Sequence, residues 1–241
     1  AFLCGDICCG TGRFPVGALR EVKRRILDDR HVGHSDDDKL RWLSQMKRYS
    51  LFGADQAAGS IQKARINMLL YGEDHGQLLK VDDSLTDPHL DRLIGKFDLI
   101  LTNPPFGSGK YEDPRGMARM RDGNAGLELG WSWTAGDRSK RKPLEKADPA
   151  SLFIDRNLQL LKPGGRLLIV VPDGILCNSG DAYIREYFMG MKDEETGEFL
   201  GGKAIVRAVV SLPTETFSIA GTGAKTSFVY LQKKRHPAEK Q

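Results

Sequence analysis

An apolar stretch that runs directly into two consecutive prolines constrains the fold of this chain more than any other feature. Residues 97–102 have the composition of a buried strand, and Asn103-Pro104-Pro105-Phe106 follow at once. Proline cannot donate a hydrogen bond to a sheet, and it forces the residue before it into an extended conformation. We therefore expect the chain to leave a sheet in extended form at Asn103.

This tetrapeptide carries the groups that bind a flat heterocycle with an exocyclic amino group. The side-chain oxygen of Asn103 and the carbonyl oxygen of Pro104 can both accept hydrogen bonds from one amino group. Phe106 offers a ring face for stacking. The pattern indicates an active site with Asn103, Pro104, Pro105 and Phe106 as catalytic residues. An ordinary exit from a strand into a loop is the alternative reading.

Strands and helices alternate through the first half of the chain. We expect strands at residues 2–6, 50–54, 78–81 and 97–102, and helices at about 15–30, 39–48 and 58–70, the second of these inside a solvated insertion at 32–49. Regular alternation is typical of a parallel sheet with right-handed helical crossovers. The first half therefore predicts the α/β class.

The second half begins with a break in this pattern. Residues 107–148 are rich in glycine and charge, so we expect a long loop or insertion there. Further elements are expected at 149–161 (helix), 166–171 (strand), 182–188 (helix), 192–202 (hairpin), 205–212 (strand) and 227–231 (strand), before a frayed basic tail at 233–241. A chain of 241 residues with 40% hydrophobic residues is long enough for one substantial core, so we expect a single domain over 1–241.

Acidic residues follow three of the expected strands, at Asp6, Asp55 and Asp83. The carboxyl ends of parallel strands converge on one crevice, where Gly10 and Gly12 would let the backbone approach a ligand. An acid after the second strand can accept hydrogen bonds from a ribose, so we expect a nucleoside-containing cofactor. Gly-Thr-Gly lacks the third glycine of the dinucleotide motif. S-adenosylmethionine, which is cationic and has no phosphate, suits Asp6 better than a dinucleotide does. The alternative role for the three acids is to cap the helices that follow them.

Composition excludes several classes of protein. The net charge of +4 permits a polyanionic partner without demanding one. No apolar run approaches the roughly 20 residues that cross a bilayer, so we expect a cytoplasmic protein. The cysteines form no C-x-x-C pair, which argues against a zinc site or a disulfide framework; they are Cys4, Cys8, Cys9 and Cys177.

Several motifs, taken in order, resemble those of N6-adenine DNA methyltransferases. They are Asp6-Ile7-Cys8-Cys9-Gly10-Thr11-Gly12, Gly53-Ala54-Asp55, the segment 64–72, Asp83-Ser84-Leu85 and Asn103-Pro104-Pro105-Phe106. The chain is most similar to the modification subunit of type I restriction–modification systems. That similarity continues through Gly164-Gly165-Arg166, Val171-Pro172-Asp173-Gly174, Leu212-Pro213, Phe217 and Lys225-Thr226. Each motif is weak by itself, but the ordered set is specific.

The resemblance implies a fold, an activity and partners. The fold would be Rossmann-like, as in S-adenosylmethionine-dependent methyltransferases, with a mostly parallel doubly wound sheet and an antiparallel last strand. The activity would be site-specific transfer of a methyl group from S-adenosylmethionine to the N6 amino group of adenine in DNA, as part of a restriction system. The partners would be DNA, a specificity subunit and a restriction subunit, with no membrane and no metal.

The resemblance also assigns roles to residues. Asp6 would lie by the methionyl amino group of the cofactor, Asp55 would hold the ribose hydroxyls and Asp83 would accept from the cofactor's adenine amino group. Phe217 would stack on the target base opposite Phe106. The remaining expected cofactor-binding residues are Cys8, Gly10, Thr11, Gly12 and Ser84.

The chain departs from the family pattern at its start. It begins inside the first strand, so we expect the family's preceding motif and its N-terminal helical domain to be absent. Two other functions stay open at this point. One is methylation of a protein glutamine or of an amino group of an RNA base, and the other is a truncated, non-catalytic subunit that binds DNA or helps assembly.

Overall fold

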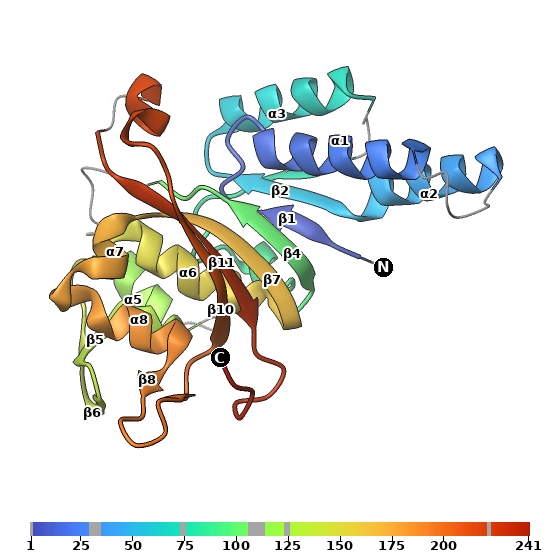
Figure 1. Ribbon diagram of the computed structural model, residues 1–241. Helices are drawn as coiled ribbons and strands as arrows, with labels where there is room; N and C mark the ends of the chain where they lie inside the picture. Colours follow the sequence, from blue (N-terminus) through green and yellow to red (C-terminus); the bar gives the residue numbers. More distant parts are fainter. Residues whose placement is uncertain (1, 29–34, 73–75, 106–113, 123–125, 221–222) are drawn as a thin grey trace.

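A seven-stranded sheet with the order β10-β11-β7-β4-β1-β2-β3 forms the centre of the molecule (Figure 1). The computed structural model describes residues 2–28, 35–72, 76–105, 114–122, 126–220 and 223–241. The strands of the sheet are β1 (Cys4–Asp6), β2 (Leu51–Asp55), β3 (Gln77–Lys80), β4 (Phe97–Thr102), β7 (Leu161–Pro172), β10 (Ala204–Ser211) and β11 (Thr226–Lys233). Strand order reverses between β1 and β4, which is where ligands bind in open α/β sheets.

Five adjacent strands of this sheet, β3 to β7 in spatial order, run parallel. The last strand, β11, runs antiparallel to both β7 and β10. Its first residue, Thr226, lies opposite Pro172 at the carboxyl end of β7. The predicted mostly parallel α/β sheet with an antiparallel last strand is therefore confirmed.

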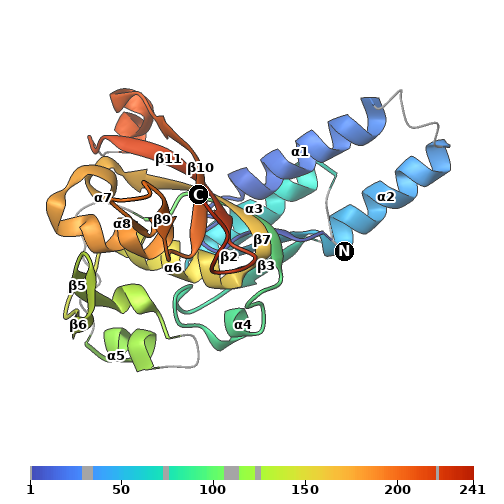
Figure 2. The same ribbon diagram turned by 60° about the horizontal axis from the view of Figure 1, so that its bottom comes forward.

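Helices cover both sides of the sheet (Figures 1 and 2). One side carries α1 (Arg13–Asp28), α2 (Asp36–Tyr49) and α3 (Ala58–Leu70), and the other carries α4 (Pro88–Asp91), α5 (Pro114–Asp122), α6 (Pro149–Leu160), α7 (Asp173–Cys177) and α8 (Ala182–Met189). In both views α1 and α2 continue side by side beyond the edge of the sheet. Among the described helices, none combines the length and apolar character that a membrane span requires.

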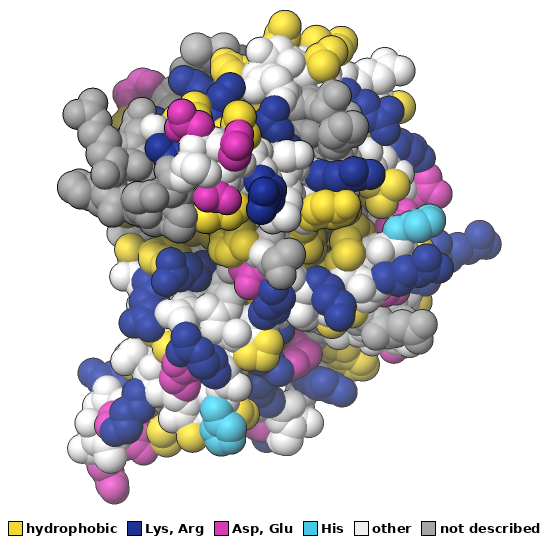
Figure 3. Space-filling model, turned by 90° about the vertical axis from the view of Figure 1, so that its right-hand side faces the viewer, with side chains coloured by type: hydrophobic (Ala, Val, Ile, Leu, Met, Phe, Trp, Pro, Cys, Tyr) yellow, Lys and Arg dark blue, Asp and Glu magenta, His cyan; other side chains and the backbone are white. Residues whose placement is uncertain are grey.

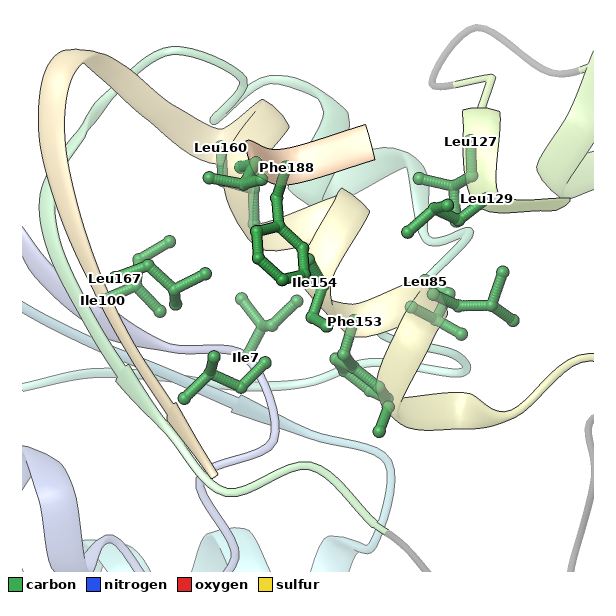
Figure 4. Close-up of a cluster of buried hydrophobic side chains, with 14 of the residues drawn as sticks. Ile7, Leu85, Ile100, Leu127, Leu129, Phe153, Ile154, Leu160, Leu167 and Phe188 are labelled. Carbon is green, nitrogen blue, oxygen red and sulfur yellow. The ribbon is translucent and has the colours of Figure 1, made fainter. Parts of the chain in front are cut away.

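Buried apolar side chains form one cluster on each side of the sheet. In the larger cluster, Ile154 and Leu160 of α6 and Phe188 of α8 face Ile100 and Leu167 of the strands (Figure 4). The smaller cluster fills the space between β1 to β3 and the helices α1 and α3. Burial on both faces explains why these strands are apolar along their length rather than alternating.

Gly5 makes room for an aromatic contact inside the sheet. Phe97 is fully buried, and its ring packs edge-on against Phe52 with 5.5 Å between centroids. A Cβ atom at Gly5 would overlap the Phe97 ring. Glycine is therefore required at this point of β1 by the packing of its neighbour.

The segment 107–148 differs from the expected long loop in the part that the structure describes. It contains α5, the short 3-10 helix η1 (Glu128–Gly130) and a hairpin of β5 (Trp131–Thr134) and β6 (Asp137–Pro143). The Trp133 indole donates a hydrogen bond to Glu186 of α8 over 3.0 Å. Charge and glycine dominate the composition of these elements, so the sequence does not reveal them. A few buried side chains hold them in place.

The carboxyl-terminal tail differs in part from the expectation, because hydrogen bonds hold its two ends although residues 235–238 are exposed. Lys234 is only 7% exposed. The Gln241 side chain donates to the carbonyl oxygens of Met189 and Ala204, each over 2.7 Å. The predicted hairpin at 192–202 is confirmed as β8 (Met191–Lys192) and β9 (Phe199–Leu200). Two short 3-10 helices complete the fold. They are η2 (Ser179–Asp181), between α7 and α8, and η3 (Thr214–Ala220), before β11.

Gly5→Ala should destabilise the protein, because the added methyl group overlaps the buried Phe97 ring. We expect the free energy of unfolding in urea to fall by about 1–3 kcal/mol. Gly17→Ala is the matched control, since its Cβ would enter open space on the exposed side of α1. That variant should be unchanged or stabilised by about 0.5–1 kcal/mol. Equal effects of the two substitutions would contradict the packing argument.

Candidate active site at the carboxyl ends of the strands

A cavity of about 460 Å³ lies at the carboxyl ends of the parallel strands. Its lining includes six of the residues that the sequence predicts for the site, which are Cys8, Asp55, Asp83, Ser84, Asn103 and Pro105. Asp55 is the last residue of β2, and the other five residues lie in the loops that follow β1, β3 and β4. The fold thus brings together side chains that lie almost 100 residues apart in the sequence, as expected for a parallel sheet.

Asn103 contributes a buried acceptor to this cavity. It directly follows β4, and among the described residues no donor reaches its side-chain oxygen, although that atom is shielded from solvent. A buried acceptor without a partner is costly, so such an atom suits a ligand that brings its own N–H group. Pro104 is buried beside it, and Pro105 is exposed toward the cavity. The predicted stacking residue Phe106 lies outside the described residues.

A hydrogen-bond network joins the end of β1 to the end of β4. The Asp6 carboxylate accepts a hydrogen bond from the Thr102 hydroxyl over 2.7 Å and another from the Cys8 amide over 3.0 Å. The Cys8 sulfur lies 2.9 Å from the same hydroxyl. Thr102 is the residue before Asn103, so this network fixes the backbone from which Asn103 extends.

Asp6 is 1% exposed and is not among the residues that line the cavity. Its burial raises the pKa of the carboxyl to about 7, and the nearby charge of Asp55 acts in the same direction. The hydrogen bonds from Thr102 and Cys8 oppose this shift because they stabilise the ionised form. Asp6 therefore takes up a proton near neutral pH in the folded protein.

The glycine turn after β1 is held against Asp55. Each carboxylate oxygen of Asp55 accepts one backbone hydrogen bond of 2.9 Å, from Gly10 and from Ala57. Gly12 has φ +80°, and a Cβ there would lie 3.0 Å from the Cβ of Ala64 in α3. Since each carboxylate oxygen has more than one lone pair, Asp55 keeps acceptor capacity toward the cavity. Thr11, the middle residue of the turn, accepts a hydrogen bond from Asn67 through its carbonyl oxygen.

Asp83 and Ser84 form the third side of the cavity. The Asp83 carboxylate accepts hydrogen bonds of 2.9 Å from the Leu85 amide and the Thr86 hydroxyl. The Ser84 hydroxyl donates to the carbonyl oxygen of Ile7 and so ties this loop to the segment after β1. Asp83 therefore presents a fixed acceptor at the cavity, and Ser84 has a bracing contact.

Several site residues were not predicted from the sequence. The cavity is also lined by Gln56, Leu85, Pro149 and Phe153, and Thr102 supports it through Asp6. Gln56 and Leu85 are next to the predicted residues Asp55 and Ser84 in the sequence, so their place in the cavity could have been predicted. Pro149 and Phe153 lie in the first two turns of α6. No motif in the sequence indicates that this helix lies near Asp55. Phe217 is half-buried on η3 and does not line the cavity, so its stacking role stays a prediction.

The chain matches one protein family over almost its whole length. Residues 3–241 match the model described as N-6 DNA Methylase. The chain belongs to this family. The type II methyltransferase M.MamI of Microbacterium ammoniaphilum is 43% identical to this member of the family over 117 residues, which are 48% of this chain and 29% of the relative. The EcoEI methylase subunit of a type I restriction enzyme from Escherichia coli is 27% identical over 228 residues, 95% of this chain and 37% of the relative.

Solved structures support the N-6 DNA methylase fold. The M protein of the type I restriction enzyme EcoKI, from Escherichia coli K12, aligns with a TM-score of 0.62 and 23% identity over 96% of this chain and 40% of its own. A type I methyltransferase subunit from Streptococcus thermophilus aligns with a TM-score of 0.59 and 20% identity over 97% of this chain and 40% of its own. The chain thus spans about a third of the length of the curated relatives, 29% and 37% for the two named above.

Asp6→Asn should change how stability depends on pH. The pKa of Asp6 is about 7 in the folded protein and about 3.9 in the unfolded chain, so between these values the native state binds the extra proton and wild-type stability falls as pH rises. Asparagine has no such proton but can still accept from Thr102 and Cys8. The variant should gain stability relative to wild type from about pH 4 to pH 7, by at most about 1.4 kcal/mol per pH unit.

Urea unfolding at several pH values measures this difference. Asp193→Asn is the control: hydrogen bonds from the Thr196 amide and hydroxyl hold the pKa of this exposed surface carboxyl below its usual range. Its relative stability should show no such gain with pH. A constant difference between Asp6→Asn and wild type over this range would show that Asp6 is ionised in the fold.

Proposed function

We propose that this chain is the catalytic part of a site-specific DNA methyltransferase that transfers a methyl group from S-adenosylmethionine to the N6 amino group of adenine. The observation that carries the proposal is the buried side-chain oxygen of Asn103, which has no hydrogen-bond partner among the described residues and lies in the same cavity as Asp55 and Asp83. Membership of the N-6 DNA methylase family supports the same reaction. The relatives named as type I methylase subunits support a role in a restriction–modification system.

The residues of the cavity fit S-adenosylmethionine. A cofactor of this kind presents ribose hydroxyls and an adenine amino group as donors, and Asp55 and Asp83 are carboxylate acceptors on the cavity wall. Gly10, with φ +53°, removes side-chain bulk from the turn beside Asp55. In our proposal Asp55 holds the ribose and Asp83 holds the adenine amino group. When bound, the cofactor supplies an electrophilic methyl group on a sulfonium centre.

Asn103 and Pro104 prepare the target nitrogen for attack. The lone pair of an adenine amino group is delocalised into the ring, so this nitrogen is a poor nucleophile. The side-chain oxygen of Asn103 and the carbonyl oxygen of Pro104 would each accept one of its hydrogens and favour a pyramidal nitrogen with a directed lone pair. Alignment and preorganised acceptors then supply most of the rate enhancement, and no strong base is required.

The target base has to leave the DNA stack to reach this cavity. Extrusion of a base costs a few kcal/mol, and aromatic stacking in the pocket offsets part of that cost. We propose Phe106, which directly follows Pro105, and Phe217 of η3 as the stacking residues. Phe153, which is 5% exposed, adds a fixed apolar surface to the cavity wall.

We also propose that the chain acts with partner subunits on DNA in the cytoplasm. Relatives over 95% of this chain are named as methylase subunits of type I restriction enzymes. One solved structure that aligns over 96% of the chain concerns the assembly of a type I restriction–modification system. Proteins described as subunits act within complexes, so a specificity subunit would choose the DNA sequence and a restriction subunit would cleave.

Asn103→Ala should abolish methyl transfer and leave cofactor binding intact, because Asn103 addresses the target amino group. We expect transfer of a radiolabelled methyl group to DNA to fall by at least about 100-fold. Calorimetric titration with S-adenosylmethionine should give an affinity close to that of the wild-type protein. Nucleoside analysis of the digested DNA should find N6-methyladenine as the product.

Asp55→Ala is the matched variant, and it should weaken cofactor binding itself. Together the two variants separate the two halves of the site. Activity retained by Asn103→Ala would remove the proposed mechanism. Labelling of protein glutamine or of RNA in place of DNA would assign a different substrate, and absence of saturable cofactor binding by the wild-type protein would indicate a non-catalytic subunit.

A further inference from the structure

A second cavity, of about 410 Å³, lies at the end of the sheet opposite the candidate active site. It is formed where α6 ends and β7 begins, next to the last residue of β11 and the turn before β10. Its lining includes the charged residues Glu128, Arg138, Lys203, Lys233 and Lys234, together with Tyr187. None of these residues takes part in the methyl-transfer site described above.

Positive charge dominates this lining. Four cationic side chains, Arg138, Lys203, Lys233 and Lys234, meet one carboxylate, Glu128. Glu128 already pairs with two of them, with Lys203 over 2.6 Å and with Arg138 over 2.8 Å. The formal charge of the lining is therefore +3, from four cations and one anion. On the face of the molecule that Figure 3 shows, Lys and Arg side chains are spread over the surface. The lining of the second cavity brings four cationic side chains to one hollow.

Lys233 and Lys234 donate hydrogen bonds only to neutral acceptors among the described residues. The Lys233 ammonium donates to the carbonyl oxygens of Leu161 over 2.8 Å and Gln159 over 3.4 Å. The Lys234 ammonium donates to the carbonyl oxygen of Gly201 over 2.6 Å. Each ammonium has three N–H groups, so donors remain available on both.

Burial makes this arrangement costly for the protein alone. Lys234 is 7% exposed, and burial lowers the pKa of both lysines. The charge of Lys203 lowers the pKa of Lys233 further, while Glu239 offsets part of the effect at Lys234. Partly buried cations that repel one another favour an anionic partner, which would neutralise them and fill their remaining donors.

We propose that this cavity binds a small anion with two adjacent phosphate groups. Lysine ammonium groups are point charges that suit phosphate oxygens, and a charge of +3 matches a diphosphate better than a single monoanion. The four cations come from three separate segments that meet at this cavity, which are the β5–β6 hairpin, the turn before β10 and the end of β11. The Tyr187 hydroxyl is committed to Asp155 over 2.5 Å, which leaves the lysines as the main donors.

Titration with inorganic pyrophosphate tests the proposal. Isothermal calorimetry should show saturable binding to the wild-type protein at constant ionic strength, and the melting temperature should rise with ligand concentration. Lys203→Gln and Lys233→Gln should each raise the dissociation constant by about tenfold or more. Lys63→Gln, an exposed lysine of α3 on the other side of the sheet, should leave it unchanged.

The variants are chosen so that folding can be checked separately. Lys203 is exposed, so its substitution should leave the melting temperature without ligand close to that of the wild-type protein. Absence of saturable pyrophosphate binding by the wild-type protein would overturn the proposal, as would equal affinity in Lys203→Gln and Lys63→Gln. A short DNA duplex serves as the second ligand. If the two cavity variants weaken duplex binding while pyrophosphate does not bind, the surface follows a nucleic-acid backbone and the small-anion site is excluded.

Discussion

The hydrogen bond between the Thr102 hydroxyl and the Asp6 carboxylate is the contact on which the candidate active site depends. It joins the ends of two neighbouring parallel strands at the point where the strand order reverses. Asp6 accepts the Cys8 amide with the same oxygen, so one buried carboxyl fixes both the start of the glycine turn and the residue before Asn103. The position of the Asn103 side-chain oxygen follows from this link, because a proline next to Asn103 removes most of the remaining backbone freedom.

The sequence predicts the order and direction of the central elements well. Apolar runs bounded by Gly, Pro and Asp indicate the strands. Because the ends of parallel strands converge, the sequence also predicts that Asp55, Asp83 and Asn103 lie together, and these three residues line one cavity. Two kinds of feature could not be predicted. The β5–β6 hairpin is held by tertiary contacts such as that of Trp133 with Glu186, which local composition does not reveal. The contribution of α6 to the cavity depends on how a helix packs on the sheet, and not on any motif.

Acidic and basic side chains gather at opposite ends of the parallel strands. Carboxylates and an amide gather at the carboxyl ends of the parallel strands, where they suit donors such as hydroxyl and amino groups. Lysines gather at the opposite end, where the last turn of α6 presents carbonyl oxygens to Lys233. A cation near the carboxyl end of a helix is favoured by the helix dipole, so α6 offsets part of the cost of burying this lysine.

The reversed direction of β11 places its two ends at opposite ends of the parallel strands. Thr226 lies beside the carboxyl end of β7, whereas Lys233 reaches the beginning of β7 at the lysine-rich cavity. One strand of eight residues therefore runs from the carboxyl end of β7 to the lysine-rich cavity. Because side chains alternate between faces along a strand, inserting or deleting one residue in β11 would exchange the inward and outward positions of every residue beyond it. The length of this strand is for that reason under constraint from both ends of the molecule at once.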